Sequence, residues 1–493
     1  MLKQFLKDSV IYGFGKFITS AISFFLVPVY TRVFSPADYG TIDILNAIST
    51  LILMTVALEV SQGVIRFIID APTQEERINY SSTALWFSVV VYTLFVTGTI
   101  IFASPLSILL LGQGGQETAF QWAMVAIWGT GVFRLAQNQL RYQMKSGKYT
   151  FVSVLDTVLS LILSVVLVVT FKMGIVGVFV GGLLASLIST VLGFYWARED
   201  YGWRFNWHKL GEMLRFSLPL VPSGIGVFVY LYIDRLTITR LMTMTDVGLF
   251  GVGYRIASMV SLLMFGFQTA LTPLIYNHYR EPNTPNQLAR LFRYFSAAAL
   301  LVTIGLSLYS REILAILTTE QYASAWAVVP LLVPASIFST LYIFAPGLAI
   351  AKKTSAIALI NIAGATINTI LNFLFIPVWG IEGAALATLT STIIVFGCYM
   401  FFSQRSYSVP HSWGRLVAAG VITIGIVAAG NQMAESTVLN LVVKAALIVV
   451  AGGIYLVLGL VTPAEFKRIL LIVRSETLKL MRRLSKQPPV QPM

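Results

Sequence analysis

The chain has 493 residues, of which 57% are hydrophobic and only 11% are charged. A soluble domain carries roughly a quarter of its residues charged, so this composition excludes a water-soluble globular protein. The single cysteine, Cys398, excludes an intramolecular disulfide and a cysteine-based metal site. The histidines His208, His278 and His411 lie in polar segments without metal-ligand spacing, and we expect no cofactor.

Apolar runs long enough to cross a bilayer occur fourteen times. The first, from Val10 to about Tyr30, has no cleavage pattern after it, so we expect the protein to keep it. The sequence therefore predicts an all-α polytopic membrane protein with about 14 transmembrane helices. The runs centre near residues 20, 52, 93, 126, 160, 184, 228, 258, 300, 334, 365, 391, 422 and 450.

The basic residues predict the orientation. With the N-terminus placed in the cytoplasm, 26 of the 34 Lys and Arg residues lie on the inner side, four lie outside and four lie within spans. This asymmetry follows the positive-inside rule and predicts that both termini are cytoplasmic. The net charge of +13 therefore reports topology and not binding to nucleic acid. The outer loops are short and leave no room for an enzyme domain, so we expect no enzymatic activity.

Two motifs recur at nearly equal offsets. Residues 31–40 read TRVFSPADYG, and 208 residues later 239–248 read TRLMTMTDVG. Residues 174–177 read GIVG, and 206 residues later 380–383 read GIEG. Two matching offsets predict one duplication, and a unit of six spans inserts both halves the same way up. The predicted divisions are 1–205 (spans 1–6), 206–405 (spans 7–12), 406–462 (spans 13–14) and 463–493 (a cytoplasmic basic amphipathic tail).

The first motif has the spacing of a capping box, in which a hydroxyl and a carboxylate satisfy backbone N–H groups at a helix start. Ser35 with Asp38, and Thr243 with Asp246, are thus predicted to open spans 2 and 8. Gly40 and Gly248 follow and permit close packing. A third box at 462–465 precedes the tail, which we expect to lie on the inner leaflet, although a solvated basic tail fits almost as well.

An ionised group within a span costs about 2.5–3.5 kcal/mol, so each needs a structural or functional reason. Most such groups gather in the first two spans of each half, as a polar cavity between the halves would require. The alternative is an ion pair between Asp234 and Arg255, with the others reaching the interface; Asp43 lies too near that interface to be informative. The groups are Lys16, Asp43, Glu59, Asp156, Asp234, Arg235, Arg255 and Lys444.

Two equivalent spans also carry polar stripes. At about 100° per residue, the asparagines of span 11 share one face, as do the polar residues of span 5. Hydrogen bonds between helices would explain both stripes, and more readily for the serines. The asparagines and Asp156 are the better candidates for lining a wet cavity. The stripes consist of Asn361, Asn368 and Asn372 in span 11, and Ser153, Asp156, Ser160 and Ser164 in span 5.

Residues 29–40, VYTRVFSPADYG, together with the tandem halves, two extra spans and short loops, resemble the polysaccharide transporter (Wzx-type flippase) branch of the multidrug/oligosaccharidyl-lipid/polysaccharide (MOP) exporter superfamily. The resemblance implies a V-shaped, two-lobe transporter that alternates between inward-open and outward-open states. It also implies a bacterial cytoplasmic membrane location and an undecaprenyl-pyrophosphate-linked oligosaccharide carried from the inner to the outer leaflet for surface polysaccharide synthesis.

The resemblance further implies a cationic central cavity that receives the anionic pyrophosphate and its sugars. From their positions in the spans, Lys16, Arg235 and Arg255 are the candidate cations, and Asn361, Asn368 and Asn372 join them as candidate substrate ligands. Asp156 and Asp234 are candidates for ion coupling or for the cavity wall. No metal site is expected.

The sequence contains no phosphate-binding Gly-x-x-x-x-Gly-Lys-Ser/Thr loop, so energy must come from an ion gradient, the membrane potential or consumption of the product. The expected partners are the lipid-linked oligosaccharide, membrane lipids, a coupling cation (H⁺ or Na⁺), a glycan polymerase and glycosyltransferases. A cation-coupled multidrug antiporter is the main alternative, although span 1 carries Lys16 and no acid. A lipid II flippase also stays open, whereas a glycosyltransferase or polymerase would need a large outer loop.

Overall fold

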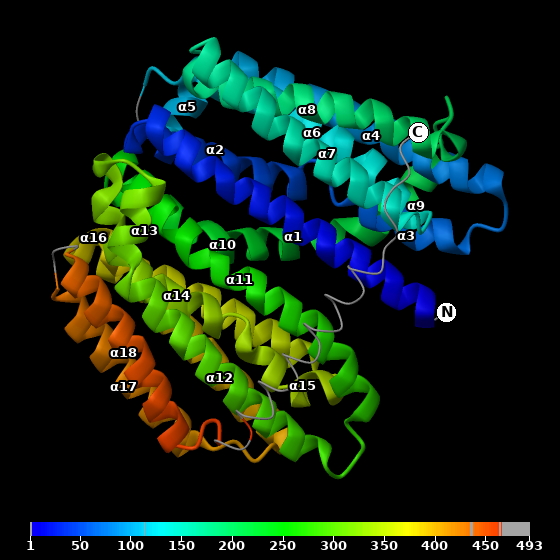
Figure 1. The fold of residues 1–493 in the computed structure, drawn as a ribbon. Helices are drawn as coiled ribbons and strands as arrows, with labels where there is room; N and C mark the ends of the chain where they lie inside the picture. The colour runs from blue at the N-terminus through cyan, green and yellow to red at the C-terminus, as the bar shows by residue number, and fades with distance from the viewer. Residues whose placement is uncertain (1, 113, 434–436, 463–464, 466–493) are drawn as a thin grey trace, which may run out of the picture.

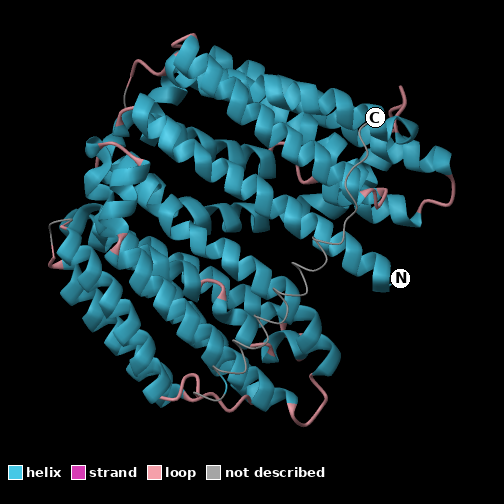
Figure 2. Cartoon of the chain, viewed as in Figure 1, coloured by secondary structure: helices cyan, strands magenta, loops and turns pink. Residues whose placement is uncertain are grey.

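The computed structural model describes residues 2–112, 114–433, 437–462 and 465. These residues form helices joined by turns and loops, without any strand (Figure 2). The predicted all-α class is therefore confirmed for the part of the chain that is described. The predicted amphipathic tail lies outside the described residues apart from Glu465, whose N–H and carboxylate complete the expected capping box with Thr462.

Eleven helical segments of the described chain are long and apolar enough to cross a membrane. One of them, α16 (Thr354–Ser406), contains two helices that meet at Gly380, where φ is 57°. Two further helices, α6 (Glu117–Tyr142) and α11 (Met244–His278), have 26 and 35 residues and also match predicted spans. Counted in this way, the described residues hold fourteen crossing helices at the expected positions, and the protein is a multi-pass membrane protein.

The helices form two bundles that meet at one end and diverge toward the start of α1, giving a V (Figure 1). Following the predicted orientation, we call the end where the bundles meet the outer end. The first bundle contains α1 (Leu2–Val33), α2 (Pro36–Thr55), α3 (Val60–Asp70), α4 (Gln74–Ile101), α5 (Ala103–Leu111), α6, α7 (Ser146–Val165) and α8 (Gly174–Ala197). The second contains α10 (Val221–Leu241), α11, α12 (Thr284–Leu308), α13 (Ser310–Leu317), α14 (Val329–Phe338), α15 (Gly347–Ile350) and α16.

Three helices stand outside this division. The short α9 (Trp207–Ser217) begins the second repeat but packs against α3 and α4 of the first bundle. The last two, α17 (Trp413–Asn431) and α18 (Val438–Val457), pack against α12. Buried Lys444 of α18 pairs with Glu312 of α13 at 2.5 Å. This ion pair fastens α18 to the second bundle.

The two copies of the repeated motif lie against each other at the outer end. Both predicted capping boxes form: the Ser35 N–H donates to Asp38 at 3.2 Å, and the Thr243 N–H donates to Asp246 at 3.0 Å. The glycine that follows each box allows α2 and α11 to touch. A Cβ on Gly40 would overlap the Met244 carbonyl oxygen, and a Cβ on Gly248 would overlap the Pro36 carbonyl oxygen. The contact is reciprocal, as a duplicated motif on a pseudo-twofold axis requires.

The second repeated motif shows the same equivalence in its backbone. Gly174 begins α8 and Gly380 lies at the kink of α16, and both have φ of 57°. This left-handed conformation favours glycine because it has no Cβ to clash. Each glycine thus turns the chain between two crossing helices, at the positions that the two GIxG motifs make equivalent.

Candidate functional site

A buried ion pair joins the two bundles. Arg235 of α10 donates to Asp43 of α2 at 2.5 Å, and their side chains are only 5% and 10% exposed. The ring of Tyr254 on α11 lies under the guanidinium, 4.4 Å from it. Two charges in this setting neutralise each other, and the aromatic ring adds a cation–π contact.

The interpretation of Asp43 as an uninformative interface residue is wrong. It is buried beneath the second bundle and approaches Gly251 of α11, where a Cβ would lie 3.0 Å from its Oδ2 atom. Hydropathy shows how deep a residue lies along a span, but it does not show which neighbouring helix covers that residue. The available signal was electrostatic: a buried Arg235 needs a carboxylate, and few lie within the spans.

Arg255 of α11 is the second arginine where the bundles meet. It is partly exposed, and its guanidinium lies 5.8 Å from the centre of the Tyr39 ring on α2. It forms no ion pair with any residue that the structure describes. The alternative of an Asp234–Arg255 pair is therefore wrong, and Arg255 has a positive charge available to an anion.

Asp234 instead belongs to a polar cluster within the second bundle. Its carboxylate accepts hydrogen bonds from Asn372 Nδ2 at 2.6 Å and from Thr388 Oγ1 at 2.8 Å. Asn372 also donates to the backbone oxygen of Asn368 at 3.0 Å, and Asn368 donates to Ser391 at 3.2 Å. Hydrogen bonding between helices therefore accounts for these two asparagines, which are 0% and 3% exposed.

The cluster contains one unsatisfied acceptor. Asn372 Oδ1 is buried and has no hydrogen-bond partner among the described residues. Asn372 Nδ2 donates to both the Asp234 carboxylate and the Asn368 amide oxygen, and the Thr388 hydroxyl completes a group of oxygen-bearing side chains with a single negative charge. Carboxylate, amide and hydroxyl oxygens are the ligands that hard cations prefer. The cluster has the chemistry of a monovalent cation or proton site.

The other predicted residues lie apart from these two groups. Lys16 is exposed on α1 toward its starting end, and no ion pair to it occurs among the described residues. Asn361 is exposed and accepts a hydrogen bond from the Tyr399 hydroxyl at 3.2 Å. Asp156 lies in the first bundle beside Ser189 of α8, with its Oδ1 atom buried and lacking a hydrogen-bond partner in the described chain. The structure therefore does not gather all the predicted residues into one site.

Span 2 contains a break that the sequence did not indicate. Between α2 and α3, Leu58 and Glu59 have φ of 51° and 52°. Non-glycine residues rarely adopt this left-handed conformation, and two in succession are unfavourable. Hydrogen bonds from Ser217 to the Leu58 oxygen and from Tyr142 to the Ser61 oxygen, both 2.7 Å, hold the break in place. No glycine or proline marks it.

At the outer end, the bundles are also joined through the end of α1. The Arg32 guanidinium donates to the carbonyl oxygens of Ile316 at 3.1 Å and Leu317 at 3.4 Å in the second bundle. The Tyr322 hydroxyl donates to the Phe34 oxygen at 2.9 Å. These contacts close the molecule at the outer end, and the bundles splay apart at the opposite end.

In the other half of the repeat, the contact equivalent to that of Arg32 is open. Arg240, the counterpart of Arg32, is exposed and borders a hollow of about 220 Å³ between α5 and α10. The other walls of this hollow include Leu109, Leu110 and Phe373. The two halves of the outer closure therefore differ, although their sequences repeat.

Comparison with known proteins identifies relatives of this chain. It is 24% identical over 299 residues to a protein of the Lsg locus of Haemophilus influenzae, covering 59% of this chain and 70% of that protein. It is 22% identical over 323 residues to the succinoglycan biosynthesis transport protein ExoT of Rhizobium meliloti, covering 64% of this chain. The alignment spans only 62% of ExoT, slightly less than two thirds of its length.

Solved structures share the fold. The lipid II flippase MurJ in an inward closed conformation matches 91% of this chain and 99% of its own, with a TM-score of 0.69 at 14% identity. An inward-facing MATE multidrug resistance transporter of the MOP superfamily matches 84% and 96%, with a TM-score of 0.66 at 13% identity. These matches confirm the predicted MOP-type architecture. The functions named among the similar proteins are transport and flipping, which agrees with a protein that is not an enzyme.

The family model described as "Polysaccharide biosynthesis protein" matches residues 29–327, more than half of the chain. The match begins at the VYTRVFSPADYG motif and extends through both arginines at the bundle contact. It therefore covers the first bundle from the last residues of α1 onward, together with α10 and α11, which bring the second bundle onto it. The chain belongs to the polysaccharide biosynthesis protein family.

Proposed function

We propose that this protein is a flippase that carries an undecaprenyl-pyrophosphate-linked oligosaccharide from the inner to the outer leaflet of a bacterial cytoplasmic membrane, with both termini cytoplasmic. The observation that carries the proposal is Arg255, a partly exposed cation without an ion pair in the described chain, placed where the two bundles meet. A pyrophosphate is the anionic group that this substrate offers. Family membership and the named functions of ExoT and MurJ support the same class of cargo.

In this proposal, the halves 1–205 and 206–405 rock against each other, 406–462 moves with the second half, and α9 stays with the first bundle, against which it packs. The splayed inner side admits the pyrophosphate and sugars, while the polyprenyl chain stays in the bilayer. Lys16, on the inner part of α1, attracts the anion first, and Arg255 then binds it near the outer closure. Opening of the Arg32 contacts releases the glycan outside. Glycosyltransferases supply the substrate, and a glycan polymerase consumes it.

The Asp234 cluster is the proposed coupling site, for Na⁺ or H⁺. Its support is the set of four oxygen-bearing side chains and the unsatisfied Asn372 Oδ1 atom. Because Asp234 and Arg235 are adjacent on α10, a change in the charge of the cluster acts directly on the helix that carries the buried ion pair with Asp43. Asp156 is the second candidate, in the other bundle.

Leaflet-to-leaflet movement in liposomes tests the proposal. Purified protein is reconstituted with a fluorescent pyrophosphate-linked oligosaccharide lipid, and movement is followed with a reagent that reaches only the outer leaflet. Arg255→Gln should reduce movement at least about ten-fold, because a charge-assisted bond to phosphate contributes about 1.5–3 kcal/mol. Arg280→Gln is the matched control. Arg280 is exposed, and its guanidinium also lies near an aromatic ring, 5.5 Å from the centre of the Tyr279 ring. Wild-type movement by Arg255→Gln would contradict the assigned role.

A cation-coupled multidrug antiporter is the second candidate, favoured by the buried Asp156 carboxylate and by the fold shared with a MATE transporter. A cationic drug is therefore tested in the same liposomes. Movement of the drug without the lipid would replace the flippase proposal. Movement of lipid II alone would assign the protein to peptidoglycan synthesis.

A further inference from the structure

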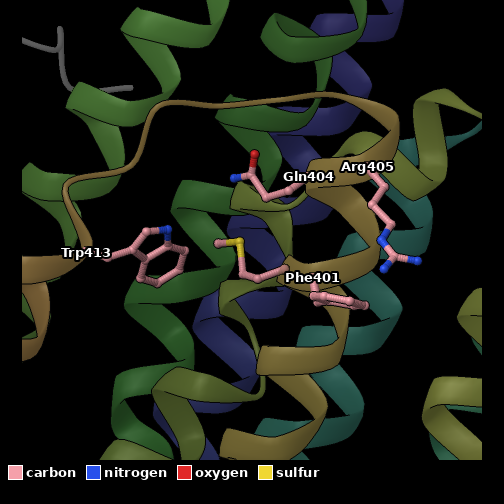
Figure 3. Close-up of a pocket in the computed structure, with 5 residues that line it drawn as sticks. Phe401, Gln404, Arg405 and Trp413 are labelled. Carbon is pink, nitrogen blue, oxygen red and sulfur yellow. The ribbon is translucent and has the colours of Figure 1, made fainter.

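A surface hollow lies away from the contact between the bundles, between the end of α16 and the start of α17. The structure has a hollow of about 420 Å³ there, lined by Met400, Phe401, Gln404, Arg405 and Trp413 (Figure 3). Trp413 lies on one side, with Phe401 and Arg405 on the other. Twelve crossing helices separate this hollow from the start of the chain, so it opens on the inner side with the N-terminus.

The walls of this hollow are apolar and uncovered. Phe401 is 55% exposed and Trp413 is 42% exposed, and they lie close to the end of α16 and at the start of α17, where a spanning helix meets the membrane interface. Tryptophan is enriched at that level because its ring is apolar while its N–H needs a polar partner. Exposed aromatic surface in this position is suited to acyl chains.

The rim of the hollow is positively charged. The Arg405 guanidinium lies 4.3 Å from the centre of the Phe401 ring, which holds it beside the apolar wall. Lys353 donates to Ser406 at 3.2 Å, so a second cationic group is held beside the residue that follows Arg405 in the chain. No lining residue is acidic. Gln404 exchanges hydrogen bonds with the Val409 backbone at 2.8 and 3.1 Å, which leaves Arg405 as the charged lining group available to a ligand.

We propose that this hollow binds an anionic glycerophospholipid of the inner leaflet. Its phosphate binds Arg405 with help from Lys353, and one acyl chain lies against Met400, Phe401 and Trp413. Basic pockets between transmembrane helices on the cytoplasmic side favour anionic headgroups. The C-terminal segment is a poorer occupant, because residues 466–493 carry seven Lys and Arg residues against one Glu, and would meet a positive rim. The bound lipid would tie α17 to the second bundle.

The test counts lipids bound to the full-length protein. Protein purified in a neutral detergent is titrated with phosphatidylglycerol or with zwitterionic phosphatidylcholine of the same acyl chains, and adducts are resolved by native mass spectrometry. Arg405→Gln should weaken phosphatidylglycerol binding about five-fold and leave phosphatidylcholine unchanged, as removal of one interfacial cation predicts. Phe401→Ala should weaken both. Arg280→Gln, which removes an exposed arginine stacked on an aromatic ring outside this hollow, should change neither.

Three outcomes would overturn the proposal. Equal binding of both lipids, insensitive to Arg405→Gln, would mean that only ordinary annular lipid is present. Saturable binding of a polyprenyl phosphate that displaces phosphatidylglycerol would reassign the hollow to the transported substrate. Unchanged phosphatidylglycerol binding in a monodisperse Arg405→Gln, Lys353→Gln variant would remove the cation-based argument. The assay measures binding alone, so none of these outcomes depends on what the protein transports.

Discussion

At the scale of single residues, the buried pair of Asp43 and Arg235 is the most consequential contact between the bundles. Removing two charges from water is costly, and only their close contact offsets that cost. Loss of one partner leaves the other buried and unpaired. The pair therefore acts less as a source of stability than as a constraint on which residues can face each other between α2 and α10.

Asp43→Asn should lower the free energy of unfolding by about 3–5 kcal/mol, because Arg235 would keep its charge without a counterion. The double variant Asp43→Asn, Arg235→Gln should recover much of that loss. Thermal unfolding in detergent, followed by intrinsic fluorescence, measures both. Arg66→Gln is the control, since the Arg66–Asp70 pair is exposed and should contribute no more than about 1 kcal/mol. A loss of similar size in Arg66→Gln would show that the assay does not distinguish buried pairs from exposed ones.

Because His411 is partly buried in the loop between α16 and α17, we expect the stability of the protein to depend on pH. Burial lowers its pKa to about 4, below its ordinary value near 6.5. The unfolded chain therefore binds more protons between these values, and stability falls as the pH drops through this window. From pH 7 to pH 5 the wild-type protein should lose about 1–2 kcal/mol through this group, and His411→Gln should lose less. Unfolding temperatures at both pH values test this, with exposed His278→Gln as the control.

Sequence reasoning found most charged residues of the site but not their partners. Arg235, Arg255 and Asp234 were recognisable because ionised groups in spans are rare. Their partners depend on which helix lies beside which, and neighbouring residues can face different helices: Arg235 faces α2, whereas Asp234 faces α16. A single sequence contains no information about this lateral packing, so the predicted site divides into two in the structure.

At the scale of helices, local signals were sufficient for the spans and their starts, but not for the break within span 2. Apolar length located the spans, and the Ser35 and Thr243 capping boxes located the starts of α2 and α11. The break at Leu58 and Glu59 could not be predicted, because tertiary hydrogen bonds hold two ordinary residues in a left-handed conformation. Glycine was informative only where a positive φ or a close approach requires it.

The contact of α2 with α11 predicts a position-specific effect of alanine. Gly248→Ala should destabilise the protein by about 1–3 kcal/mol, because the new methyl group would overlap the Pro36 carbonyl and separate the helices. Gly453→Ala in α18, where a Cβ meets nothing within 4 Å, should be neutral or stabilise by up to about 1 kcal/mol through helix propensity. Unfolding temperatures of the two variants test the difference. Equal effects would mean that α2 and α11 do not touch at Gly248.

At the scale of the whole molecule, the repeated sequence produces a closure that is not symmetric. Arg32 reaches across to the second bundle, whereas Arg240 borders a hollow. A molecule whose halves move relative to each other must break the Arg32 contacts in another state. Their small number, at the narrow end of the V, makes that separation possible while the buried pair of Asp43 and Arg235 keeps the bundles together.

Crosslinking the outer closure tests this movement. Thr319 donates to the Thr31 oxygen at 3.2 Å between the bundles. In a Cys398→Ser background, Thr31→Cys with Thr319→Cys, joined by a short cleavable thiol crosslinker, should abolish lipid movement in liposomes. Cleavage of the crosslink should restore it, because only the separation of the bundles has been blocked.

The matched control pair lies within one bundle. Gln137 donates to Ser153 at 2.6 Å between α6 and α7, so Gln137→Cys with Ser153→Cys can be joined in the same way without linking the two halves. Transport should survive that crosslink, since a rigid bundle moves as a unit. Full transport by the crosslinked Thr31–Thr319 variant would mean that the outer contacts need not open. Equal loss in both variants would mean that flexibility within a bundle, and not rocking between bundles, limits the movement.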